Sequence, residues 1–290
     1  MGKRNILIIG HGEMGQAFEF LLAREDVHVW ERRAQLDLGQ LAAHCRFVFF
    51  CVPANPVFEL ASSIAPHLAN DTICLSIAKG LDDAGRPAAL ALKAALGTRA
   101  RQGVIYGPMI SEELRAGRVG FGELGVRDKS TCDNVRGLFE HSGLKLYCHN
   151  DIDGLTWCAV LKNVYAMAFG MADELRLGAN VRGFLTATAM SELSKITSLL
   201  GGDRQTPYGL AGLGDLITTA TSEDSHHHSL GRQLARGDRS QLQGEGVHTL
   251  QLIKRNNTFK YSQFPLFLAI ENIVDGSITA EQGLSRLWQA

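Results

Sequence analysis

The chain lacks any Cys-x-x-Cys pair, although six cysteines are scattered through its 290 residues. Structural zinc sites usually draw their ligands from such pairs, so no structural zinc is expected. Several of the cysteines lie inside apolar runs, where a thiol behaves as a small hydrophobic side chain. We therefore expect all six to be reduced, as in a cytoplasmic protein. They are Cys45, Cys51, Cys74, Cys132, Cys148 and Cys158.

The chain also lacks an excess of either charge. Its 29 basic and 30 acidic residues give a formal net charge of −1. Nucleic acids and anionic membranes attract proteins through broad basic surfaces, so neither is an expected partner. A small-molecule substrate that is anionic would have to be held by a few placed cations. The composition, 45% hydrophobic and 20% charged, is that of a globular chain long enough for two domains.

A signal-peptide core and a clear membrane span are missing as well. The apolar run that follows Arg4 is too short for a signal peptide and fits a strand. The run from Leu155 to Ala172 approaches the length of a membrane helix, but Lys162 and Asn163 lie at its centre and no basic clusters flank it. We expect neither a leader nor a membrane helix.

Short apolar runs alternate with helical stretches over the first half of the chain. The run Phe47–Val52 is apolar throughout, as in a parallel sheet that is covered on both faces. This alternation predicts a doubly wound α/β sheet. Strands are expected at residues 5–10, 27–30, 47–52, 73–77, 103–106, 119–126 and 145–148, and helices at 12–23, 87–96 and 131–142.

The pattern changes after about Asp151, where strand-like runs disappear. We therefore predict two domains, an α/β domain over residues 1–150 and an all-helical domain over residues 151–290. Helices of the second domain are expected at residues 154–175, 181–200, 229–236, 246–256, 264–275 and 279–289.

Residues 10–15, GHGEMG, fit the dinucleotide-binding pattern G-x-G-x-x-G. They follow the first predicted strand and open a helix, which is the context the pattern requires. Gly10 allows the tight turn, Gly12 lets the backbone approach a pyrophosphate, and Gly15 lets helix and strand pack closely. The pyrophosphate would lie on the helix N-terminus. The alternative is a plain strand-turn-helix.

The end of the second predicted strand carries opposing signals. Glu31 lies where an acidic side chain would bind the ribose hydroxyls of NAD. Arg32 and Arg33 follow at once and could clamp the 2′-phosphate of NADP, unless they are simply solvated in a loop. We therefore expect NAD or NADP, without a preference.

Lys162 is the only charged residue between Leu155 and Ala172. An ammonium in an apolar helix costs several kcal/mol unless a partner receives it, and a buried lysine is a ready proton donor or acceptor. Asn163 lies beside it, in a stripe of small and polar residues that leaves room for a ligand. The alternative is a lysine that extends to the surface.

Three further segments carry candidate chemistry. Lys79 follows a predicted strand at its C-terminal end, where ligands bind in open α/β sheets. Gly107 lies in a turn that ends another strand. Asp215 is the one carboxylate of the glycine-rich segment 209–216. The alternatives are a solvated loop lysine for Lys79 and a helix cap for Asp215.

Taken together, these motifs resemble the bacterial-type NAD(P)-dependent glycerol-3-phosphate dehydrogenases. They occur in the family's order and extend over nearly the whole chain. The resemblance implies a Rossmann-type domain followed by an all-α substrate domain. The matching segments are IIGHGEMG (8–15), CVPA (51–54), SIAKGL (76–81), YGPMISEEL (106–114), LKNVYAMAFG (161–170), GLAGLGDLITTATSEDS (209–225) and GEGVHT (244–249).

The resemblance implies hydride transfer between nicotinamide and C2 of dihydroxyacetone phosphate, which gives sn-glycerol 3-phosphate for glycerophospholipid synthesis. Lys162 matches the family's catalytic lysine. The implied substrate-binding residues are Lys79, Gly107, Asn163, Asp215, Ser225, His226 and His227. The expected cofactor-binding residues are Gly10, Gly12, Glu13, Met14, Gly15, Glu31, Arg32, Lys79, Ser111 and Glu245. A homodimer is expected by analogy with the family.

The chain departs from the family in three places. The family's Ser-Arg-Asn is Ser225-His226-His227 here, and a neutral histidine cannot make a bidentate phosphate contact. Losing that contact, worth roughly 1.5–3 kcal/mol, would weaken phosphate binding about tenfold to a hundredfold. Glu13 places a carboxylate near the expected pyrophosphate. The segment between Glu31 and Phe47 is shorter than usual.

These departures keep two rival functions open. One is a related reductase of another small 2-oxo or 2-hydroxy compound that lacks phosphate. The other is a non-catalytic NAD(P)-binding sensor, which would not need the proton-transfer residues. The run His226–His228 also suggests a metal, but adjacent histidines rarely converge on one ion, so no metal is expected and the run is predicted to be a loop.

Overall fold

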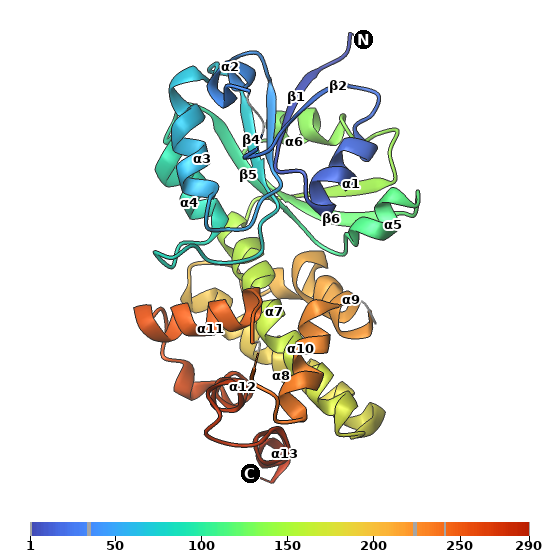
Figure 1. The fold of residues 1–290 in the computed structure, drawn as a ribbon, viewed down its shortest axis with the longest axis vertical. Helices are drawn as coiled ribbons and strands as arrows, with labels where there is room; N and C mark the ends of the chain where they lie inside the picture. Colours follow the sequence, from blue (N-terminus) through green and yellow to red (C-terminus); the bar gives the residue numbers. More distant parts are fainter. Residues whose placement is uncertain (1, 34–35, 223–224, 241, 290) are drawn as a thin grey trace. The chain divides into compact units, whose positions relative to one another are not determined.

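The computed structural model describes residues 2–33, 36–222, 225–240 and 242–289 (Figure 1). The chain divides into two compact units, Met1–Thr156 and Trp157–Ala290. The long helix α7 (Ile152–Glu174) begins in the first unit and continues into the second.

The first unit is built on one seven-stranded sheet in the order β2-β1-β3-β4-β5-β6-β7. The first five strands are parallel, β6 runs antiparallel to β5, and β7 runs parallel to β6. A strand lies at each of the seven predicted positions. The strands are β1 (Asn5–Ile9), β2 (Asp26–Trp30), β3 (Phe47–Phe50), β4 (Ile73–Ser76), β5 (Arg101–Tyr106), β6 (Gly120–Gly125) and β7 (Leu144–His149).

Helices cover both faces of this sheet, which confirms the predicted doubly wound architecture (Figure 1). Successive strand residues point to opposite faces, so Ile6 and Ile8 pack in one apolar cluster while Leu7 and Ile9 pack in the other. The first cluster lies under α1 (Glu13–Leu21), α5 (Ser111–Arg115) and α6 (Lys129–Arg136). The second lies under α2 (Leu38–Ala43), α3 (Val57–Ile64) and α4 (Ala88–Leu96).

Helix α6 is shorter than the helix predicted over residues 131–142. It begins after Asp128, whose carboxylate accepts a hydrogen bond from the Thr131 amide at 2.8 Å, and it ends before Gly137. The short helices α2, α3 and α5 were not predicted, because none of them shows a long helical period.

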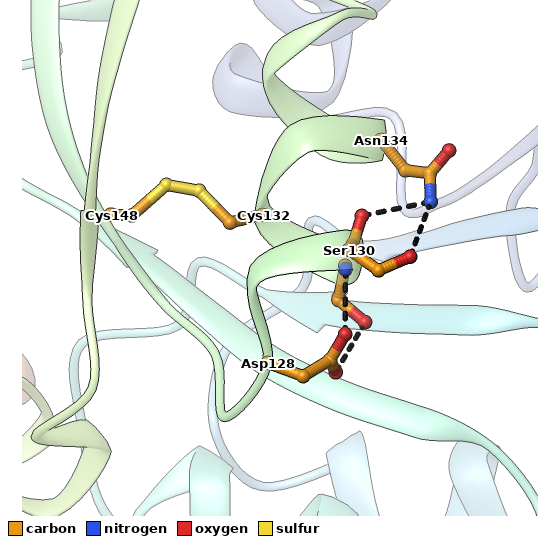
Figure 2. Close-up of a disulfide and its surroundings, with 6 residues drawn as sticks. Asp128, Ser130, Cys132, Asn134 and Cys148 are labelled. Atoms are coloured by element: carbon orange, nitrogen blue, oxygen red, sulfur yellow. Dashed lines mark hydrogen bonds between the residues drawn. A yellow bond between two sulfur atoms is a disulfide. The ribbon is translucent and has the colours of Figure 1, made fainter.

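Cys132 on α6 and Cys148 on β7 are joined in a disulfide, so the prediction of six reduced thiols is wrong for this pair (Figure 2). Their Cα atoms are 6.0 Å apart, as in ordinary disulfides. The pairing arises because α6 packs beside an edge strand, which sequence spacing does not reveal. The other four cysteines are buried and are not disulfide-bonded, and burial raises the pKa of the Cys45 thiol to about 11.

The second unit contains helices only among its described residues. They are the greater part of α7, α8 (Gly178–Leu199), α9 (Asp215–Thr221), α10 (His226–Ala235), α11 (Glu245–Asn256), α12 (Pro265–Asp275) and α13 (Ala280–Ser285), with short 3₁₀ and π turns between them. Within the described parts of the chain, α7 is the one helix long and apolar enough to cross a membrane, and the stretch that meets this test is entirely buried in protein. The core helix of a globular domain has the same character.

A buried carboxylate ties three of these helices together. Glu192 on α8 accepts hydrogen bonds from the backbone amides of Leu266 (2.7 Å) and Phe267 (3.0 Å) at the start of α12. It also accepts a hydrogen bond from the Tyr165 hydroxyl on α7 at 3.1 Å. Desolvation raises the pKa of Glu192 against the lowering effect of these hydrogen bonds. Helix α7 is therefore anchored along its length by both apolar packing and a polar network.

Candidate active site

The glycine-rich loop joins β1 to α1 and is constrained at two of its three glycines. Gly10 has φ +99°, and a Cβ there would lie 2.6 Å from the Cys51 carbonyl oxygen. A Cβ on Gly15 would lie 2.1 Å from the Gly10 carbonyl oxygen. Only glycine fits at either position, which is the close strand-helix packing expected of a dinucleotide loop.

Gly12 differs from the other two glycines because a Cβ there would meet no atom within 4 Å. The open space lies at the N-terminus of α1, where backbone amides favour an anion. The residues present therefore fit a pyrophosphate. Glu13, the first residue of α1, is exposed, and Met14 packs partly buried against the apolar cluster under α1.

A cavity of about 440 Å³ adjoins this loop. Its lining includes Gly10, Trp30 and Val52, which end or follow β1, β2 and β3. The chain turns to opposite sides of β1 at this point, and such a switch point is where open α/β sheets bind ligands. Glu31 and Arg32 also line the cavity, as expected for residues that contact the adenosine end of a dinucleotide.

A larger cavity, about 600 Å³, lies elsewhere in the same unit. Arg101, Asp128 and Asn150 line it, and Arg101 is the residue at which β5 begins. It is therefore at the opposite edge of the sheet from the glycine loop. None of the predicted site residues lines it, so its size does not make it the nucleotide site.

Lys79 and Gly107 follow β4 and β5 and lie together. The Lys79 ammonium donates a hydrogen bond to the Gly107 carbonyl oxygen at 3.3 Å, and the Tyr106 hydroxyl donates one to the Ala78 carbonyl oxygen at 2.9 Å. Gly107 has φ +146°, and a Cβ there would lie 2.6 Å from the Phe121 carbonyl oxygen. The structure thus brings these two predicted residues together at the carboxyl edge of the sheet. Ser111, buried at the start of α5, donates a hydrogen bond to Glu112 at 2.9 Å.

Lys162 is buried in α7, only 5% exposed, and it does not extend to solvent. Its Nζ donates a hydrogen bond to Thr219 Oγ1 at 2.7 Å and lies 3.5 Å from Asp215 Oδ1. Thr219 in turn donates its hydroxyl proton to the Asp215 carbonyl oxygen at 2.7 Å. The hydroxyl is therefore oriented to accept from the ammonium. The structure brings together the predicted pair Lys162 and Asp215.

A glycine-rich bend delivers Asp215 to this position. Residues Leu210–Gly214 form a π-helical turn, in which the Gly214 amide donates a hydrogen bond to the Gly209 carbonyl oxygen at 3.1 Å. A Cβ on Gly212 would lie 2.0 Å from the Pro207 carbonyl oxygen, so the bend requires glycine. Asp215 is then the first residue of α9, directly after Gly214 in the N-cap position.

Thr219 was not among the site residues predicted from the sequence. It lies four residues after Asp215 on α9, which places both side chains on one helix face. That spacing was the available signal. A threonine among several in the segment carries no charge and does not stand out without knowledge of what faces it.

Asn163 and Glu245 were predicted separately, one for substrate and one for cofactor. The Asn163 amide nitrogen donates a hydrogen bond to Glu245 Oε2 at 3.2 Å. A Cβ on Gly246 would lie 2.8 Å from the Asn163 carbonyl oxygen, so α11 approaches α7 through a glycine. The structure thus brings these two predicted residues together in the second unit, on α7 and α11.

The run His226–His228 is helical, so the predicted loop is wrong. The Ser225 side chain caps α10 by accepting from the His228 amide at 3.3 Å. His226 is exposed and its Nε2 lies 2.8 Å from the Gln243 carbonyl oxygen, while its ring meets that of His227 edge to face. The described residues contain no group of three or more histidine, cysteine or acidic side chains arranged to hold a metal ion.

His228 turns away from its two neighbours and is buried. Its Nε2 lies 2.7 Å from Asp173 Oδ2 on α7, and the other oxygen of Asp173 lies 3.3 Å from Arg182 on α8. Helices α7 and α10 also cross at glycines: a Cβ on Gly231 would lie 2.1 Å from the Met167 carbonyl oxygen, and one on Gly170 would lie 2.0 Å from the His228 carbonyl oxygen. These anchors fix α10 on α7 and were not predicted.

An ammonium that is buried, paired with a carboxylate and held by an oriented hydroxyl can donate a proton to a carbonyl oxygen as that oxygen gains charge. Together with a glycine-rich dinucleotide cradle, this group defines a nucleotide-dependent oxidoreductase. Two family models match the chain: the NAD-dependent glycerol-3-phosphate dehydrogenase N-terminus over residues 33–131 and the C-terminus over residues 151–285. The chain belongs to the NAD(P)+-dependent glycerol-3-phosphate dehydrogenase family.

Individual relatives agree with this family. Glycerol-3-phosphate dehydrogenase [NAD(P)+] of Gloeobacter violaceus is 32% identical over 259 residues, 86% of this chain and 85% of its own length. The protein of the same name from Acaryochloris marina is 29% identical over 99% of this chain and 96% of its own length. The crystal structure of glycerol-3-phosphate dehydrogenase from Coxiella burnetii shares the fold, with a TM-score of 0.88, 23% identity and 99% of both chains covered. The predicted resemblance is confirmed.

Proposed function

We propose that the protein catalyses reversible hydride transfer between NAD(P)H and dihydroxyacetone phosphate, which gives sn-glycerol 3-phosphate. The observation that carries the proposal is the buried Lys162, held 2.7 Å from Thr219 and 3.5 Å from Asp215. A charge buried in the middle of a helix is costly, and a stable core would be built more simply without it. A proton-transfer role accounts for its presence.

Three residues of the second unit have separate roles in the reaction at the carbonyl. When bound, the dinucleotide supplies the hydride. The Lys162 ammonium donates a proton to the substrate oxygen as the carbonyl becomes an alcohol. The Asp215 carboxylate keeps the lysine charged before the transfer, and the Thr219 hydroxyl fixes the direction of the ammonium. In the oxidative direction the neutral amine accepts the same proton.

Residues of both units hold the two ligands in this proposal. The glycine loop binds the pyrophosphate through backbone amides at the start of α1. Lys79, at the carboxyl edge of the sheet beside Gly107, supplies a cation for the substrate phosphate or the cofactor. Asn163 positions the substrate from α7, with its amide oriented by Glu245.

The test is oxidation of NADH and of NADPH with dihydroxyacetone phosphate and with non-phosphorylated ketones. We expect turnover by the native protein and a loss of roughly a thousandfold or more in kcat for Lys162→Ala. Lys195→Ala, which removes an exposed lysine of α8, is the control and should leave kcat unchanged. No turnover of any ketone would reject the enzymatic function in favour of a nucleotide-binding sensor.

A second candidate substrate class follows from the phosphate end. His226 stands where the family has an arginine, and its ring is committed to the Gln243 carbonyl oxygen at 2.8 Å. This observation favours a small 2-oxo or 2-hydroxy compound without phosphate. His226→Arg should lower the KM for the phosphorylated ketone about tenfold if a phosphate binds there. An unchanged KM would mean that the phosphate is held elsewhere or is not part of the substrate.

The cellular setting belongs to the same proposal. Glycerol 3-phosphate is a precursor of glycerophospholipids, so we assign the protein to that supply and to the cytoplasm. We also propose a homodimer, by analogy with the family. Light scattering at several protein concentrations tests the dimer, and a monomer throughout the range would reject it.

A further inference from the structure

The first unit indicates which of the two nicotinamide cofactors the protein takes. We infer that the cavity at the end of β2 selects the free 2′-hydroxyl of NADH against the 2′-phosphate of NADPH. This inference rests on the proposed dinucleotide-dependent function and specifies its cofactor.

The position of Glu31 is the first step. Ile9 of β1 is paired with Trp30 of β2, and the Gly10 amide donates a hydrogen bond to the Trp30 carbonyl oxygen at 2.8 Å. Glu31, the next residue, is therefore level with the glycine loop. A dinucleotide whose pyrophosphate lies on α1 places its adenosine ribose at the end of β2, and an acidic residue there binds the ribose hydroxyls.

The charge of the cavity is the second step. Three carboxylates line it, those of Glu31, Glu59 and Asp83, and Arg32 is the one cation in its lining. They come from three separate segments: the residues after β2, helix α3, and the loop before α4. The excess of negative charge is therefore a property of the cavity and does not depend on one side chain.

The third step concerns two neighbouring arginines, because either could offset the negative charge of the cavity. Arg86 donates a hydrogen bond to Asp82 at 2.8 Å and lies over the Phe58 ring at 4.0 Å, so its guanidinium is already engaged. Arg33 is exposed and is absent from the lining of the cavity as the described residues define it. Arg32 is thus the one arginine that lines the cavity among the described residues.

The chemistry of the two cofactors then decides between them. The ribose 2′-hydroxyl of NADH donates a hydrogen bond, which a carboxylate such as Glu31 accepts. A 2′-phosphate carries a charge of roughly −1.5 to −2 at neutral pH and offers acceptor oxygens only. In this cavity it would replace a hydrogen bond with repulsion from carboxylates on several sides.

Direct binding tests the inference without turnover. Titration calorimetry of the full chain with NADH and with NADPH should give a Kd for NADH that is lower by about tenfold or more. Raising the salt to about 1 M should narrow this ratio, because surface charges are then screened beyond about 3 Å. The variant Glu31→Gln/Glu59→Gln/Asp83→Asn should bring the two Kd values to within about threefold, mainly by tighter NADPH binding. The matched control is Glu140→Gln, an exposed carboxylate of the same unit that does not line this cavity, and it should leave the ratio unchanged.

Three other outcomes would contradict either the inference or the function on which it rests. NADPH binding as tight as NADH binding would mean that the inference is wrong. A loss of NADPH affinity in Arg32→Ala would then show that Arg32 clamps the 2′-phosphate. An unchanged ratio in the triple variant would remove the three carboxylates from cofactor selection. Failure to bind either dinucleotide would reject the proposed function itself.

Discussion

Each unit carries a candidate site of its own, and the two sites are built from different materials. In the first unit the backbone makes the site: Gly10 and Gly15 leave no space for a Cβ, and Gly12 opens onto free space at the start of α1. In the second unit buried side chains make it, with Lys162 and Asp215 each nearly inaccessible to solvent.

This difference predicts how each unit fails. A backbone site is lost when a side chain is added, and charge changes nearby only tune its affinity. A side-chain site is lost when one partner is removed, because the remaining charge stays buried without compensation. Removing a buried partner in the second unit should therefore lower the stability of the fold, whereas adding a side chain at Gly12 in the first unit should weaken cofactor binding without lowering stability.

The largest effect is expected for Asp215→Leu, which leaves the Lys162 ammonium buried without its carboxylate. We expect a loss of about 3–5 kcal/mol in the free energy of unfolding, measured by urea denaturation. The double variant Lys162→Met/Asp215→Leu should regain most of that loss while remaining inactive. If the double variant is no more stable than Asp215→Leu, then the cost does not come from an uncompensated charge.

Gly12→Leu should have the opposite signature. The space at Gly12 is open and its φ of −70° suits any residue, so the urea midpoint should not change. The Kd for NADH should rise about a hundredfold, or about 2.7 kcal/mol, because the side chain fills the pyrophosphate space. Gly15→Leu is the contrast, since its Cβ would clash with Gly10 and the fold itself should suffer. Unchanged NADH binding in Gly12→Leu would place the pyrophosphate elsewhere.

A smaller effect is expected at the disulfide of the first unit. Cys132→Ser/Cys148→Ser opens a loop that the bond closes over a sequence separation of 16 residues. The loop-entropy account predicts a loss of about 2–3 kcal/mol in stability. A reducing agent should lower the free energy of unfolding of the native protein, measured by urea denaturation, by the same amount. It should leave the stability of the double variant unchanged. Equal midpoints with and without reductant would show that the bond does not stabilise the fold.

The smallest effect is expected for Thr219→Val, which keeps the shape but removes the oxygen that Lys162 contacts at 2.7 Å. We expect kcat to fall about tenfold, or about 1.4 kcal/mol in the activation barrier, with little change in KM. Thr218→Val is the matched control, because its hydroxyl donates only to the Gly214 carbonyl oxygen in its own helix. A fall in kcat of similar size in the control would point to a general disturbance of α9.

Much of the first unit could be predicted because local sequence patterns mark the residues of its candidate site. A glycine pattern after an apolar strand identifies the loop, and the carboxyl ends of parallel strands place Lys79 and Gly107 at one edge. The same locality explains the main error in this unit. The pairing of Cys132 with Cys148 depends on how a helix packs against an edge strand, and no local pattern records that contact.

The second unit was predictable only in part. An isolated charge in an apolar run marked Lys162, and a lone carboxylate among glycines marked Asp215. Thr219 and Asp173 carried no comparable signal, because the contacts with Lys162 and His228 span 57 and 55 residues of sequence. The run His226–His228 is predicted as a loop that partly replaces the family's arginine, whereas the Ser225 side chain caps a helix that begins at His226.

The crossing of α7 and α10 has a consequence for how such enzymes diverge. Helix α10 is held on α7 by the close approach at Gly170 and Gly231 and by the His228–Asp173 contact. None of these anchors involves His226, the exposed residue at the position of the family's arginine. A substitution at position 226 can thus leave the helix that carries it in place.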